Sequence, residues 1–86
     1  MATYRVEVTS KTVKEIARLE QDIGMKILQS VENLALNPRP KNSRKLFGSE
    51  SSYRIRVRDY RVIYQVDDQL KQVTVFRVVH RREAYR

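Results

Sequence analysis

The sequence contains no cysteine and a single histidine, His80, and these absences narrow the chemistry open to it. They exclude a disulfide framework, a thiolate metal site, a cysteine nucleophile and a metal site built from several histidines. Glycine and proline are scarce, with two of each, and no repeat or low-complexity tract is present. The composition is that of a folded domain.

Long apolar runs are also missing. No stretch approaches the roughly 18 consecutive apolar residues that a membrane-spanning helix needs, and the first residues lack the apolar core of a signal peptide. We therefore expect a soluble protein of the cytoplasm with no membrane partner. The 86 residues have room for one domain, 1–86, near the size at which a single core becomes marginal.

Basic side chains are abundant, with 18 lysines and arginines against 10 acidic residues and a formal net charge of +8. Residues 1–43 hold seven basic and five acidic side chains, whereas residues 44–86 hold eleven and five. A basic surplus gathered on part of a small domain is typical of nucleic-acid-binding proteins, although an acidic protein partner stays open. Membrane-surface binding normally uses a basic amphipathic helix, which is not the pattern here.

The first half of the chain has the pattern of a strand followed by two helices. Apolar and polar residues alternate over 4–8, as in a half-buried strand. Thr9 and Ser10 are candidate N-caps, and Thr12 with Glu15 has the spacing of a capping box, so a helix should begin here. Apolar residues then recur every three or four positions, and Gly24 is the expected break between two helices.

The second half has the pattern of a β-meander. Asn37-Pro38-Arg39-Pro40 ends the second helix, and in the polar connection that follows we expect Leu46 and Phe47 to contact the core. Strand-like segments then occur at 53–57, 60–66 and 73–79. The order β-α-α-β-β-β predicts an α+β fold, with two helices packed on one face of a small antiparallel sheet and a short terminal segment after the last strand.

Arginines alternate with apolar residues in the segment SYRIRVRDYRVIY. If Arg58 and Asp59 form a two-residue turn, the apolar residues of the two strands face one another, Arg56 lies opposite Arg61, and Arg54 shares their face. A three-residue loop would mix apolar residues with arginines, so we favour the first register. Like charges directly opposite each other on neighbouring strands destabilise a sheet. A bound phosphate would explain why arginines occupy these positions. An ordinary solvated sheet face is the alternative.

The C-terminal residues include groups suited to proton transfer. Cleavage of RNA by its own 2′-hydroxyl needs a base, cations around the phosphorus and an acid for the leaving 5′-oxygen. Histidine is the side chain best suited to proton transfer near neutral pH, which makes His80 a candidate, and Tyr85 could transfer a proton if nearby arginines lowered its pKa. Structural roles for both residues stay open.

Two segments, KLFGSESSYRIRVRDYRVIYQV and VFRVVHRREAYR, resemble the RelE branch of the RelE/ParE superfamily of prokaryotic toxins. The resemblance implies a RelE-like, microbial-RNase-like fold. It implies a toxin of a type II toxin-antitoxin system, a metal-independent endoribonuclease (mRNA interferase) that needs no cofactor, cleaves mRNA in the ribosomal A site and inhibits translation. It also implies a cognate antitoxin, for which the positive charge favours an acidic protein.

The resemblance also implies which residues form the site: Arg54, Arg56, Arg61, Arg81 and Tyr85. His80 is an alternative proton carrier. Lysines often occupy positions 54 and 56 in the family, whereas arginine cannot be deprotonated in a protein, so the base would be Tyr85 or His80. A ParE-like inhibitor of DNA gyrase without nuclease activity is one alternative function, and a non-catalytic RNA-binding module is another.

Overall fold

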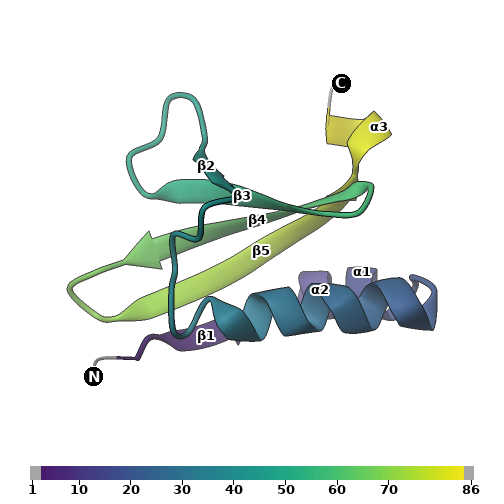
Figure 1. Ribbon diagram of the computed structural model, residues 1–86, viewed down its shortest axis with the longest axis horizontal. Helices are drawn as coiled ribbons and strands as arrows, with labels where there is room; N and C mark the ends of the chain where they lie inside the picture. The colour runs from purple at the N-terminus through teal and green to yellow at the C-terminus, as the bar shows by residue number, and fades with distance from the viewer. Residues whose placement is uncertain (1–2, 85–86) are drawn as a thin grey trace.

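In the computed structural model, which describes residues 3–84, two helices pack on one face of a five-stranded sheet (Figure 1). The predicted α+β class is confirmed. In chain order the elements are β1 (Arg5–Val8), α1 (Ser10–Ala17), α2 (Gln21–Asn33), β2 (Ser43–Lys45), β3 (Ser52–Val57), β4 (Tyr60–Asp67), β5 (Gln72–His80) and α3 (Arg81–Ala84). Among the described residues, no helix has the length and apolar character needed to span a membrane.

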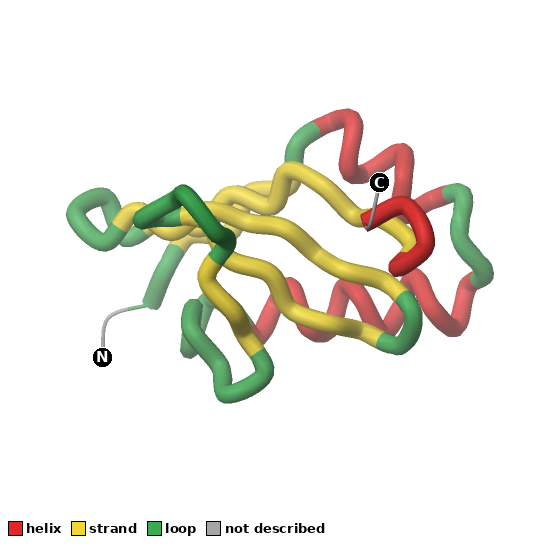
Figure 2. The backbone as a smooth tube through the Cα atoms, turned by 90° about the horizontal axis from the view of Figure 1, so that it is seen from above, coloured by secondary structure: helices red, strands yellow, loops and turns green. Residues whose placement is uncertain are grey.

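The sheet has the strand order β1-β5-β4-β3-β2, and its strands lie side by side over the helices (Figure 2). β1 pairs with β5 in parallel, with Val6 beside Val73, whereas the other neighbouring strands are antiparallel. The sheet is therefore mixed, and the prediction of a purely antiparallel sheet is wrong at β1. Alternating apolar residues indicate a half-buried strand but carry no information on the direction of its neighbour.

The hairpin of β3 and β4 has the predicted register. Val57 lies opposite Tyr60, and Arg56 lies opposite Arg61. The turn between the strands contains no glycine, and Arg58 adopts a φ of 56°, in the left-handed region that is unfavourable for most side chains. The pairing of apolar residues therefore sets the register, because a shift by one residue would move them all to the solvent face.

The start of α1 confirms Thr9 as the N-cap. Its Oγ1 accepts a hydrogen bond from the N–H of Thr12 at 3.3 Å and lies 2.7 Å from the hydroxyl of Thr12. The predicted capping box of Thr12 with Glu15 is wrong, because the N-cap is Thr9, three residues before Thr12. The Glu15 carboxylate instead accepts a hydrogen bond from the N–H of Val78 at 3.1 Å, which joins α1 to β5.

The break between the helices lies at residues 18–20, so the prediction that Gly24 separates them is wrong. Gly24 is buried near the start of α2, where the two helices meet. A Cβ atom at this position would lie 3.6 Å from the backbone oxygen of Ile16 and 3.7 Å from its Cγ2. These are ordinary van der Waals distances, so the site has room for one methyl group.

We therefore expect Gly24→Ala to raise the free energy of unfolding by up to about 1 kcal/mol, since alanine is the better helix former. Urea unfolding followed by circular dichroism measures the change. Gly24→Val is the control, and it should lower stability because its branched side chain overfills the contact with Ile16. A destabilised alanine variant would mean that the methyl group clashes with Ile16.

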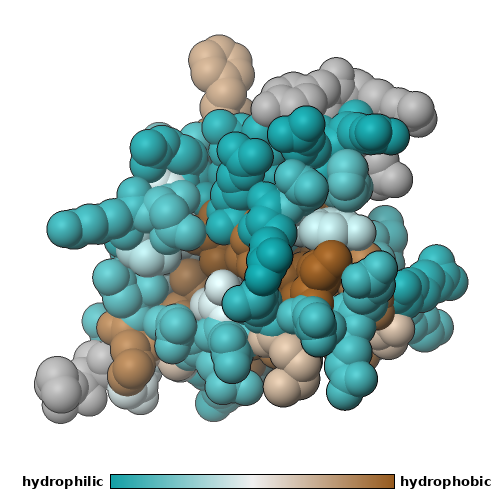
Figure 3. Space-filling model, turned by 45° about the vertical axis from the view of Figure 1, so that its right-hand side comes forward, coloured by the Kyte–Doolittle hydropathy of each residue, from teal (hydrophilic) through white to brown (hydrophobic). Residues whose placement is uncertain are grey.

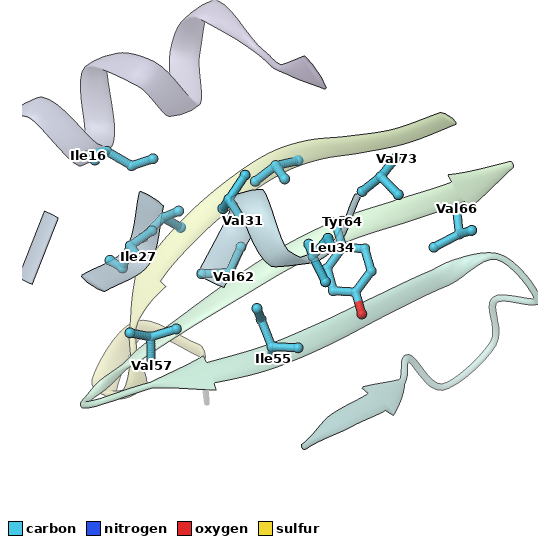
Figure 4. Packing of buried hydrophobic residues seen from close by; sticks show 12 residues of the cluster. Ile16, Ile27, Val31, Leu34, Ile55, Val57, Val62, Tyr64, Val66 and Val73 are labelled. Carbon is cyan, nitrogen blue, oxygen red and sulfur yellow. The ribbon is translucent and has the colours of Figure 1, made fainter. Parts of the chain in front are cut away.

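The core lies between the helices and the sheet, where apolar side chains from both layers point toward one another (Figure 4). Figure 3 shows the same layer as a band of apolar residues between hydrophilic surfaces. Tyr64 is the largest fully buried side chain. Its hydroxyl donates a hydrogen bond to the carbonyl of Pro38 at 2.7 Å, and its ring stacks on Tyr53 with 5.9 Å between centroids.

The connection after α2 contains the short strand β2, which the sequence analysis did not predict. Leu46 is half-buried, but Phe47 is exposed, so its predicted contact with the core is wrong. The chain turns over residues 46–49, where Gly48 has a φ of 81° and the N–H of Ser49 bonds to the carbonyl of Leu46. Because of this turn, Leu46 and Phe47 have different surroundings.

Candidate active site

The arginines predicted to share a sheet face do so, and β2 adds a fourth. Arg56 lies opposite Arg61, Arg54 precedes Arg56 by two residues on the same strand, and Arg44 of β2 lies opposite Arg54. This face is the one turned away from the helices, because the intervening residues of β3, such as Ile55, belong to the core. We call these four residues the arginine face.

Sequence reasoning missed Arg44 because β2 is a three-residue edge strand without apolar alternation. The one available signal was the cluster of basic residues around it, Lys41, Arg44 and Lys45. Its position became apparent only from the pairing with β3.

Two adjoining hollows lie over the arginine face. The first has a volume of about 310 Å³ and is lined by Asn42, Arg44, Arg54, Arg56 and Arg61. The second has a volume of about 300 Å³ and is lined by Arg56, Arg61, Arg81 and Arg82. Because Arg56 and Arg61 line both, the hollows form one basic surface that spans strands β2, β3 and β4 and the helix α3.

Backbone carbonyls orient two of these arginines. Nη1 of Arg44 donates to the carbonyls of Lys41 at 3.2 Å and Ser43 at 2.9 Å. Nε of Arg56 donates to the carbonyl of Arg58 at 3.2 Å. A guanidinium has five N–H donors, so these contacts fix its direction and leave donors for an anionic ligand.

Within residues 3–84, no acidic side chain forms an ion pair with Arg44, Arg54 or Arg56. Arg39 shows the contrast at the far end of the sheet, since its guanidinium contacts both carboxylate oxygens of Asp68, at 3.2 and 2.8 Å. Hydrogen bonds from Arg39 and then from Tyr4 hold the pKa of Asp68 below its usual range. Clustered guanidinium groups such as those of Arg44, Arg54 and Arg56, without acidic partners, favour binding of a polyanion.

The helix α3 is attached to the end of the β3–β4 hairpin (Figure 1). The N–H of Arg81 donates to the carbonyl of Asp59 at 2.7 Å, which links α3 to the turn between β3 and β4. The N–H of Arg82 donates to Nδ1 of His80 at 3.2 Å, in the manner of a helix N-cap. These contacts hold Arg81 and Arg82 beside Arg56 and Arg61.

The structure does not bring His80 to the arginine face. His80 lies opposite Tyr60, whose side chain packs against the core, and the two rings meet edge to face at 5.2 Å. The neighbouring pair, Val79 opposite Arg61, has the other orientation. Of the predicted site residues, Arg54, Arg56, Arg61 and Arg81 therefore converge, His80 lies on the opposite face, and Tyr85 is outside the described residues.

Solved structures share this fold. The archaeal RelE–RelB complex from Pyrococcus horikoshii contains a chain that aligns with a TM-score of 0.84 and 31% identity, over 92% of this chain and 96% of that one. A mutant of the E. coli toxin RelE in the free state aligns with a TM-score of 0.79 and 26% identity, over 96% of this chain and 88% of that one. The architecture is thus that of RelE-type toxins.

Sequence comparison agrees with the fold. The chain matches the family described as ParE toxin of type II toxin-antitoxin systems over residues 6–85. The putative toxin RelE1 of Methanocaldococcus jannaschii is 33% identical over 85 residues, which include 93% of this chain and 91% of that protein. The chain belongs to the RelE/ParE toxin superfamily, and its relatives support the RelE-like branch.

Proposed function

We propose that this protein is an mRNA endoribonuclease that acts in the ribosomal A site and thereby inhibits translation. The observation that carries this function is the convergence of Arg54, Arg56, Arg61 and Arg81 on one basic surface. Phosphoryl transfer requires cations around the phosphorus, where negative charge accumulates in the transition state, and guanidinium groups bind phosphate oxygens in pairs. On a sheet face that contacts only solvent, the same cluster would cost stability through charge repulsion with no compensating interaction.

In the proposed reaction the 2′-oxygen attacks the adjacent phosphorus and the bond to the 5′-oxygen breaks. The products are a 2′,3′-cyclic phosphate and a free 5′-hydroxyl. One proton leaves the 2′-hydroxyl and one is delivered to the 5′-oxygen, and Arg56 and Arg61 stabilise the nonbridging oxygens. The proposed steps use no metal ion as an acid or a base.

We assign proton transfer to Tyr85 rather than to His80, because the His80 ring packs on Tyr60 across the sheet from the arginines. His80 is instead a positioning residue, since its Nδ1 accepts the hydrogen bond that begins α3. Its contribution to cleavage would come through Arg81 and Arg82.

His80→Asn should therefore retain cleavage, because the asparagine side-chain oxygen can replace Nδ1 as the acceptor. His80→Ala should lose about fivefold, the effect of a missing cap. Tyr85→Phe should lose about 10²-fold or more if the phenol transfers a proton. Single-turnover cleavage rates measure all three variants. An inactive His80→Asn beside an active Tyr85→Phe would reverse the assignment.

The ribosome is the proposed source of substrate positioning. Among the described residues that line the two hollows, Asn42 is the one neutral hydrogen-bonding side chain, and the others are arginines. Such a surface attracts phosphates without selecting a base. The 2′-oxygen must attack in line with the leaving 5′-oxygen, and we therefore propose that the ribosome holds the mRNA in the required conformation.

We also propose an acidic antitoxin as the partner. The net charge of +8 favours a partner of opposite charge, and the solved Pyrococcus horikoshii structure that this chain resembles is a RelE–RelB complex. This pairing would be supported if the reading frame next to the gene of this protein encoded a small acidic protein.

A cell-free translation extract tests the nuclease against its alternatives. Added protein should produce cuts in ribosome-bound mRNA that are phased by codon. Since the matching family is described as ParE toxin, DNA gyrase inhibition is the second candidate, and it predicts blocked supercoiling with intact RNA. Salt-sensitive RNA binding without cleavage would instead indicate a binding module.

A further inference from the structure

Phe47 is exposed to an unusual extent for an aromatic side chain. Its relative exposure is 106%, whereas Leu46 beside it is half-buried. Burial of a phenylalanine side chain contributes about 2 kcal/mol to folding, and here that contribution is absent. An aromatic ring presented in this way is available to a ligand.

The loop that carries Phe47 is held in shape by its own hydrogen bonds. The N–H of Leu46 donates to the carbonyl of Ser52 at 2.9 Å, and the N–H of Ser49 donates to the carbonyl of Leu46 at 3.2 Å. The Ser49 hydroxyl accepts from the N–H groups of Ser51 and Ser52, at 3.4 and 3.1 Å. The projection of Phe47 is therefore a feature of a bonded turn and not of a loose segment.

This loop rises from the same side of the sheet as α3, away from the two helices of the core, and the two lie toward opposite ends of the sheet (Figure 1). The chain enters the loop two residues after Arg44 and leaves it for Ser52, two residues before Arg54. Both arginines line the first hollow. The loop with the exposed ring is thus linked directly to the strands at one end of the basic surface. The helix α3 lies at the other end.

We propose that Phe47 stacks on an unpaired base of the RNA strand whose phosphates lie on the arginine face. A basic groove beside an exposed aromatic ring is the combination by which proteins hold single strands, and each stacked base contributes about 1–3 kcal/mol. Stacking also tolerates every base, which suits a site whose other contacts are to phosphates. The inference rests on the proposed RNA ligand but not on cleavage of it.

Because the chain has no tryptophan, Phe47→Trp creates a single fluorescent reporter at the loop. We expect its emission to be quenched by a short unpaired RNA oligonucleotide and much less by an abasic oligonucleotide of the same length and charge. Leu70→Trp is the matched control, since Leu70 is 71% exposed in the turn that contains Asp68 and directly follows Asp67, the last residue of β4. Equal quenching by the two oligonucleotides, or in the two variants, would overturn the stacking contact.

Binding of the oligonucleotide by unlabelled variants gives a second readout. Phe47→Ala should weaken binding by about tenfold, and Phe47→Leu should weaken it similarly because it keeps apolar area without a ring. Leu70→Ala should have no effect. Unchanged RNA binding in Phe47→Ala, with or without lost affinity for an acidic protein, would refute an RNA contact. Since binding is measured without cleavage, an inactive nuclease would not obscure the result.

Discussion

Arg61→Ala should reduce the rate of cleavage of ribosome-bound mRNA by about 10²–10³-fold, the usual effect of removing one donor that stabilises transition-state charge. Arg61 lines both hollows and lies opposite Arg56, so it occupies the middle of the basic surface. Arg61→Lys should recover only part of the rate, because an ammonium keeps the charge but not the paired donors of a guanidinium. Single-turnover kinetics on programmed ribosomes measure both variants.

Arg5→Ala is the matched control for Arg61→Ala. It removes the same charge from β1, the strand at the opposite edge of the sheet from β2, where Arg5 is paired with Glu7. It should leave cleavage within about twofold, since a solvent-exposed charge at that distance is screened by salt. If Arg5→Ala and Arg61→Ala lowered the cleavage rate equally, the loss would be explained by net charge and not by the position of Arg61. A melted Arg61→Ala protein would show that the side chain supports the fold instead.

Tyr64→Ala should have the largest effect on stability, a loss of about 3–5 kcal/mol. Tyr64 is 0% exposed and lies at the centre of the core (Figure 4). The loss is a large fraction of the 5–15 kcal/mol that stabilises a typical domain, so much of the variant should be unfolded at 37 °C. Tyr64→Phe keeps the ring and removes only the bond to Pro38, which should cost about 1–2 kcal/mol. Thermal and urea unfolding measure both.

We also expect the protein to lose stability at alkaline pH because of the buried hydroxyl of Tyr64. Burial raises the pKa of Tyr64 to about 12, from an ordinary value near 10. The unfolded chain therefore releases this proton at lower pH than the folded protein. The stability that comes from this difference is fully present below pH 10. As the pH rises from 10 toward 12, the free energy of unfolding should fall by about 2 kcal/mol. Tyr64→Phe should have a shallower decline over this range, and an identical decline would contradict the assignment.

The predicted hairpin of β3 and β4 was correct because two independent features fixed it. Apolar residues at every second position required one face to be buried, and only a two-residue turn paired them with one another. The positions of Arg54, Arg56 and Arg61 followed from that pairing. This part of the candidate site could therefore be derived from local sequence.

Other features depend on contacts that local sequence does not encode. The parallel pairing of β1 with β5 joins segments more than 60 residues apart, and the three polar residues of β2 form a strand only because β3 offers an edge. Gly24 suggested a break but lies at a helix contact. The orientation of His80 likewise depends on its pairing with Tyr60, which turns its ring away from the arginine face.

Primer extension on a defined mRNA, carried by purified ribosomes stalled with an empty A site, tests the nuclease most directly. With the protein added, we predict new 3′ ends within the A-site codon, no cuts when ribosomes are omitted, and very few with Arg61→Ala. Intact mRNA on ribosomes that have bound the protein, or equal cleavage of free mRNA, would contradict a ribosome-dependent endoribonuclease.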